Sequence, residues 1–151
     1  MNVRLKEIPS ADVDEWVNAE GQAEGRLSLL RLRPRLKSFL GDPRYSRLLC
    51  ITWSYSDDGE DGMPSDDELD AMRPLEDRLV NALESAQVGT LAFVLTHHGV
   101  REWNFYVSGS ADLGAVINDA LADLPRMPIE LAIEDDANWH ALTKILDLVN
   151  A

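Results

Sequence analysis

The fold is most clearly indicated by residues 90–107, TLAFVLTHHGVREWNFYV. Apolar side chains recur at every second position on both sides of a short turn, at Leu91, Phe93 and Leu95 and again at Trp103, Phe105 and Val107. A repeat of two is typical of a strand, because successive side chains point to opposite faces of a sheet. Gly99 in the turn tolerates a positive φ. The stretch therefore predicts a β-hairpin with strands at 90–96 and 101–107.

Outward from this hairpin, residues 47–56 and 127–134 alternate in the same way and predict two more strands. A helix is predicted to start after Ser65, because Ser65 and Glu68 have the spacing of a capping box. Its apolar stripe follows at helical spacing, at Leu69, Met72, Leu75, Leu79 and Leu83. Pro74 lies inside this pattern and either kinks or divides the helix. Residues 110–124 and 137–149 predict two further amphipathic helices.

From residue 47 onward the predicted order is β-α-β-β-α-β followed by a C-terminal helix. This order indicates an α+β fold of the ferredoxin-like, split βαβ type, with its core at about 47–134. Residues 13–19 and 26–33 predict an N-terminal β-hairpin that extends or flanks the sheet. We expect a flexible lead-in at 1–12 and a single domain over 13–151.

The charge of the chain restricts its partners. Among 151 residues, 27 are Asp or Glu and 14 are Lys or Arg, which gives a net charge of −13. Such a field repels phosphate backbones, so direct binding to nucleic acid is not expected, whereas a protein with a basic surface is favoured. We see no signal peptide and no apolar run of membrane length, so we expect a cytoplasmic protein that does not contact a membrane.

The sequence predicts no catalytic residues, no metal site and no cofactor. Cys50 is the single cysteine and lies in an apolar run, so no disulfide or cysteine-based zinc site is expected. His97 and His98 are neighbours in a turn and point to opposite sides, so they cannot easily hold one metal together. Residues 57–68 partly match a calcium loop, but Gly59 offers no side-chain ligand at the third position, and a solvated acidic loop is preferred.

Several motifs along the chain resemble one known family. They are Ile51-Thr52-Trp53-Ser54-Tyr55, Gly62-Met63-Pro64, Leu75-Glu76-Asp77-Arg78-Leu79, Arg101-Glu102-Trp103-Asn104-Phe105-Tyr106 and Asp136-Ala137-Asn138-Trp139. In this order they resemble the bacterial family of unknown function DUF695, from about Trp16 to Trp139. That family is distantly similar to the regulator of ribonuclease E activity type B, a small acidic protein that inhibits by binding. The resemblance implies a ferredoxin-like fold and a binding role, and it carries no catalytic residues.

The candidate binding residues are polar groups in the acidic loop and on the sheet face that turns away from the predicted helices. They are Asp57, Asp58, Glu60, Asp61, Glu102, Asn104, Tyr106, Glu130 and Glu134. We expect a small regulatory or inhibitory protein that docks a basic partner through them. The alternatives are a metal-dependent hydrolase that uses histidines and carboxylates, and an immunity-type protein that neutralises a toxin. Seven of the 14 basic residues lie between Arg26 and Arg47, which leaves self-association with the acidic loop open.

Overall fold

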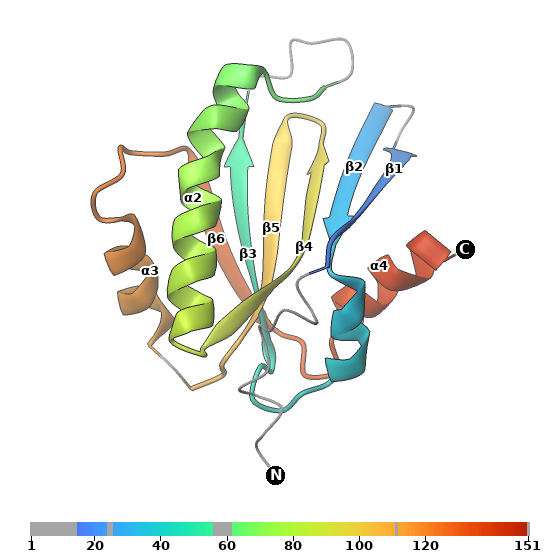
Figure 1. Cartoon of the computed structure of the whole chain (residues 1–151), viewed down its shortest axis with the longest axis vertical. Coiled ribbons are helices and arrows are strands. Elements are labelled where there is room, and N and C mark those ends of the chain that lie inside the picture. The colour runs from blue at the N-terminus through green and yellow to red at the C-terminus, as the bar shows by residue number, and fades with distance from the viewer. Residues whose placement is uncertain (1–14, 24–25, 56–61, 111, 151) are drawn as a thin grey trace.

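The computed structural model describes residues 15–23, 26–55, 62–110 and 112–150. Its strands form one antiparallel sheet in the order β1-β2-β4-β5-β3-β6 (Figure 1). The strands are β1 (Val17–Ala23), β2 (Arg26–Leu32), β3 (Arg47–Ser54), β4 (Gly89–His97), β5 (Val100–Val107) and β6 (Ile129–Asp135). The helices are the 3-10 helix η1 (Pro34–Phe39) and the α-helices α2 (Asp66–Ser85), α3 (Leu113–Leu121) and α4 (His140–Asn150). The predicted α+β class is confirmed.

The hairpin predicted from residues 90–107 lies at the centre of the sheet as β4 and β5. His98 and Gly99 join the two strands, and both have a positive φ, 49° and 79°. Two successive residues in this conformation match the right-handed twist of the strands, and glycine adopts it without strain. The turn therefore depends on Gly99, as the sequence predicts.

Helix α2 begins with the predicted capping box. The Ser65 side chain accepts a hydrogen bond from the Glu68 backbone N–H, and the Glu68 carboxylate accepts one from the Ser65 N–H. The helix then continues without interruption through Pro74, which is exposed, so proline does not divide it. Among the described residues, no helix combines the length and the apolar character that a bilayer crossing needs.

The N-terminal hairpin is present and extends the sheet, because β2 pairs with β4 in an antiparallel register that sets Leu30 opposite Leu95. The predicted second arm, 26–33, agrees with β2. The first arm begins later than predicted, at Val17, and includes residues that the sequence assigns to the turn. Residues 1–14, including the predicted lead-in, lie outside the described part of the chain.

The sheet carries a hydrophobic cluster on each face. On one face α2 and α3 cover the central strands, with Leu75, Leu79 and Leu83 fully buried against Trp103 and Phe105. On the other face η1 and α4 pack against β2, β4 and part of β5. The expectation that this second face is left free is therefore wrong over the part that α4 and η1 cover.

Candidate functional site

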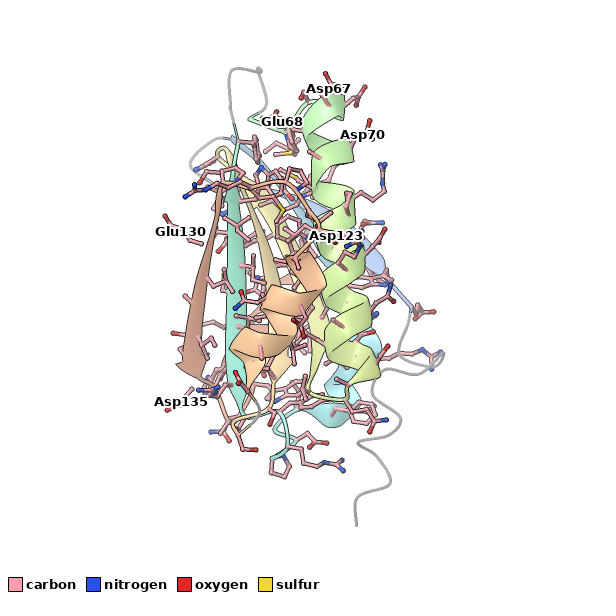
Figure 2. All side chains as sticks on the ribbon, turned by 90° about the vertical axis from the view of Figure 1, so that its left-hand side faces the viewer. Asp67, Glu68, Asp70, Asp123, Glu130 and Asp135 are labelled. Atoms are coloured by element: carbon pink, nitrogen blue, oxygen red, sulfur yellow. The ribbon has the colours of Figure 1, made fainter. Side chains whose placement is uncertain are left out.

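Strand β6 forms one edge of the sheet. It pairs with β3 on one side, and no strand among the described residues pairs with its other side. Every residue from Glu130 to Asp135 is exposed, including Leu131 at 46% and Ile133 at 43%. Figure 2 shows Glu130 pointing from this strand away from the helix layer. An open strand edge with exposed apolar side chains is a ready template for pairing with another chain.

The register determines which backbone groups of β6 face the open edge. At one end of the strand the Ser54 N–H donates to the Pro128 carbonyl, and at the other end the Asp136 N–H donates to the Ser46 carbonyl. In an antiparallel pair, residues that hydrogen-bond to the neighbour alternate with residues that do not. Leu131 and Ile133 fall between the bonded positions, so their N–H and C=O groups point away from β3.

Three carboxylates from two strands share the face of the sheet opposite α2 and α3. Thr52 in β3 is in register with Glu130 on one side and with Glu102 on the other, so all three form one row. Glu134 lies on the same side of β6, in register with Leu48. Glu130 and Glu134 are exposed, and Glu102 is half-buried. The structure therefore brings three of the predicted site residues to one side of the sheet near its edge.

Glu102 has contacts within the chain. Its carboxylate lies 3.1 Å from His97 Nε2 and accepts a hydrogen bond from the Cys50 thiol at 3.7 Å. The predicted alternative of a metal-dependent hydrolase needs histidine and carboxylate ligands to converge, and His97 and Glu102 do meet. Within the described residues, however, no group of three or more His, Cys, Asp or Glu side chains is arranged to hold a metal.

The thiol of Cys50 is not activated by this cluster. Burial, and then the negative charge of Glu102, raise the pKa of Cys50 from 9.0 to about 12. At pH 8 we therefore expect the folded protein to react with a chromogenic disulfide reagent about a thousandfold more slowly than the urea-unfolded chain, because the thiolate is the reacting form. Glu102→Gln should raise the folded-state rate. Equal rates for the folded and unfolded protein would contradict this assignment.

Two of the predicted site residues are not available to a partner. Asn104 is 6% exposed and Tyr106 is 0% exposed. The Tyr106 ring stacks on Trp139, with centroids 4.1 Å apart, and its hydroxyl donates to Asp136 Oδ2 at 2.7 Å. Burial, and then the hydrogen bond to Asp136, raise the pKa of Tyr106. The prediction that these side chains line a docking face is wrong, because both are buried, and the segment after β6 packs on Tyr106.

The acidic loop residues Asp57, Asp58, Glu60 and Asp61 lie outside the described part of the chain. Glu68, the twelfth position of the tested calcium pattern, is described and uses its carboxylate to cap α2. Exposed acids continue into this helix, where Figure 2 shows Asp67 and Asp70 near its start. Carboxylates at a helix N-terminus suit the helix dipole. Capping and the helix dipole thus explain why the first turn of α2 is rich in acidic residues.

One protein-family model matches most of the chain. The model described as a family of unknown function, DUF695, matches residues 14–146. The chain belongs to this family. The predicted resemblance is thereby confirmed for DUF695 itself. No curated protein and no solved structure matches the DUF695 chain, so a similarity to the regulator of ribonuclease E activity type B stays a prediction.

The sequence reasoning missed the exposed apolar residues of the DUF695 edge strand. Leu131 and Ile133 alternate with Glu130 and Glu134, which is the usual pattern of a strand with one buried face. They are exposed because β6 is the outermost strand, whereas Ile129 at its start packs against the cluster on the helix side of the sheet. Helix α3 is also shorter than predicted, Leu113–Leu121 rather than 110–124.

Proposed function

We propose that this chain is a small regulatory or inhibitory binding protein that accepts an extended, cationic segment of a partner protein along the open edge of β6. The observation that carries the proposal is the edge itself. Its outward backbone groups at Leu131 and Ile133 are unpaired by any described strand, and exposed carboxylates flank them at Glu130 and Glu134. Addition of a strand to such an edge is a common mode of peptide recognition.

The side chains of β6 define what the added strand would look like. Backbone hydrogen bonds to Leu131 and Ile133 would supply affinity, and alternate side chains would supply selectivity. On the helix side of the sheet the partner would meet the apolar side chains of Leu131 and Ile133. On the opposite side it would meet the carboxylates of Glu130 and Glu134. A segment that alternates apolar residues with Lys or Arg fits both sides.

The same charges disfavour a second copy of this chain as the occupant. A symmetric antiparallel pairing centred on Ala132 would set Glu130 of each copy opposite Glu134 of the other. Like charges directly opposite each other destabilise a strand pair. Self-association through β6 is therefore not part of the proposal, whereas a basic partner gains from every one of these contacts.

The net charge of −13 extends the attraction beyond the edge. A strongly acidic surface speeds the encounter with a cationic partner, and the effect falls as salt is added. We include the acidic loop residues Asp57, Asp58, Glu60 and Asp61 in the proposal only through this long-range charge. Direct contact is assigned to Glu130 and Glu134, with Glu102 further in from the edge.

A toxin-neutralising role would use the same surface and the same physics, so the identity of a captured partner separates it from other inhibitory roles. A cytoplasmic location belongs to the same proposal.

The proposed scaffold is the ferredoxin-like split βαβ unit. It is supported by the order β4-β5-β3-β6, with α2 between β3 and β4 in the chain and α3 between β5 and β6.

A synthetic peptide that alternates lysine with valine provides the test. We expect it to slow hydrogen exchange at the amides of Leu131 and Ile133, measured by NMR, because it would supply the missing hydrogen-bond acceptors. Added salt should reverse the protection. The double variant Glu130→Lys/Glu134→Lys should weaken peptide binding by about tenfold or more.

The matched control is Asp119→Lys/Asp147→Lys, which changes the net charge equally but at exposed positions on α3 and α4. It should change peptide affinity by only about twofold, since distant surface charges are screened. A peptide that alternates glutamate with valine should not bind. Equal losses in both double variants, or protection of amides elsewhere without protection at Leu131 and Ile133, would refute docking on this edge.

A further inference from the structure

A cavity opens on the helix side of the sheet, beside α2 and over the strands that α2 does not cover. It has a volume of about 570 Å³, and its lining includes Arg31 from β2, Thr96 from β4 and Arg101 from β5. A second cavity of about 220 Å³ adjoins it against α2, and Arg31 and Arg101 line both. Together they form one groove, with the sheet as its floor and α2 as a wall. This volume suits a small molecule.

Arg101 is the unusual residue of the groove. It is half-buried, and its Nε donates to the Thr96 hydroxyl at 2.9 Å. Among the described residues, no carboxylate lies within ion-pair distance of it. Burial lowers the pKa of Arg101 and the positive charge of Arg31 acts in the same direction, whereas the negative charge of Glu76 offsets part of the effect. A cation held away from water beside another cation is unfavourable unless an anion accompanies it.

The other arginines of the groove differ from Arg101 in this respect. Arg31 forms an ion pair with Glu76, and Arg73 forms one with Asp70. Glu76 also accepts a hydrogen bond from the Trp103 indole Nε1 at 2.9 Å, so its carboxylate links the α2 wall to both β2 and β5. These contacts hold Arg31 in position at the junction of the two cavities. Glu76 also attracts Arg101 and Glu20 lines the larger cavity, but among the described residues Arg101 is the arginine of the groove with no carboxylate at ion-pair distance.

We propose that this groove binds a small molecule that carries one carboxylate or phosphate group on an apolar body, with Arg101 and Arg31 holding the oxyanion. Guanidinium groups pair well with both of these anions because their planar donors match two oxygen atoms. Leu29 and Val94 also line the larger cavity and would contact the apolar part of the ligand. The net charge of −13 repels molecules with several negative charges, which favours a ligand with a single anionic group.

NMR titration at constant ionic strength tests the proposal with hexanoate, hexyl phosphate, acetate and neutral hexanol. We expect hexanoate and hexyl phosphate to shift the signals of Arg101 Nε–H and the nearby Trp103 indole N–H. Acetate should bind more weakly because it lacks the apolar body, and hexanol should leave the signals unchanged. The tighter of the two hexyl anions identifies whether carboxylate or phosphate is the preferred group.

Arg101→Gln should weaken the binding of the tighter anion by about tenfold or more, since a charge-assisted hydrogen bond is lost. Arg31→Gln provides a second, more exposed variant should Arg101→Gln fail to fold. The control Arg126→Gln removes an exposed arginine that lines neither cavity and should leave affinity within about twofold. An unchanged affinity in both groove variants, or equal shifts with hexanol and hexanoate, would overturn the proposal.

The variant Glu130→Lys/Glu134→Lys should bind the anion with normal affinity. A failure of the groove proposal can therefore be distinguished from a failure of the β6 proposal.

Discussion

Replacing Glu84 with alanine is expected to lower the free energy of unfolding by about 3–5 kcal/mol. Glu84 lies in the last turn of α2, and its Oε2 accepts hydrogen bonds from Arg33 Nη1 at 2.7 Å, Thr90 Oγ1 at 3.0 Å and the Leu91 N–H at 3.2 Å. The Arg33 side chain is only 4% exposed. Without Glu84 the buried guanidinium would lose the carboxylate that lies 2.7 Å away, and that is the source of the loss. Urea unfolding followed by circular dichroism measures it.

The control for this prediction lies on the same helix. Asp77 is exposed, and Asp77→Ala should change the free energy of unfolding by less than about 0.5 kcal/mol. The double variant Arg33→Met/Glu84→Leu should recover much of the loss, because an apolar pair leaves no unpaired charge. A Glu84→Ala protein as stable as the Asp77→Ala protein would show that the buried ion pair does not hold α2 to the sheet.

Replacing Trp139 with alanine is expected to lower the free energy of unfolding by about 3–5 kcal/mol as well. Trp139 is fully buried, stacks on Tyr106 and donates from its indole Nε1 to the Tyr45 carbonyl at 2.7 Å. It precedes α4 and connects that helix to the sheet. Its φ of 58° is unusual for a bulky residue, so its packing must offset a strained backbone. Hydrogen exchange across α4 should therefore accelerate in Trp139→Ala together with the loss of global stability.

Trp139→Phe separates packing from hydrogen bonding. It keeps a ring against Tyr106 but leaves the Tyr45 carbonyl without its donor, a loss of about 1–3 kcal/mol. Leu148→Ala, which changes a side chain that is 71% exposed on the same helix, should have an effect below about 0.5 kcal/mol. Wild-type stability in Trp139→Ala would mean that α4 is not anchored by this residue.

The parts of the fold that depend on neighbours in sequence were predictable. The hairpin at residues 90–107 and the Ser65–Glu68 capping box each depend on a few neighbouring residues, and both are present in the structure. The prediction that Leu91, Phe93 and Leu95 share one face is wrong, because a bulge between Leu91 and Phe93 places Leu91 in the cluster under α2 and Phe93 in the cluster under α4. Pro74 was undecided from sequence. Proline removes one backbone donor, four residues after Asp70, and its exposed position in α2 allows water to replace that bond. The helix therefore continues.

The candidate sites were less predictable, because they depend on which segments meet. The exposure of Leu131 and Ile133 follows from the place of β6 at the end of the strand order. The burial of Tyr106 follows from Trp139, which lies far along the chain. Arg31 and Arg101 line one groove because β2 joins β4 and β4 joins β5, a pairing that no local motif encodes.

By itself the sequence determined the element types, the helix start, the tight turn at Gly99 and the strongly acidic character of the chain. These properties follow from side-chain periodicity, capping and charge, which act locally or simply add up over the chain. Only the tertiary structure decided which carboxylates remain exposed on β6, that Tyr106 is buried against the segment leading into α4, and that Arg31 and Arg101 line one groove. Burial and pairing are properties of the packed sheet and its helices, and they arise only when distant segments come together.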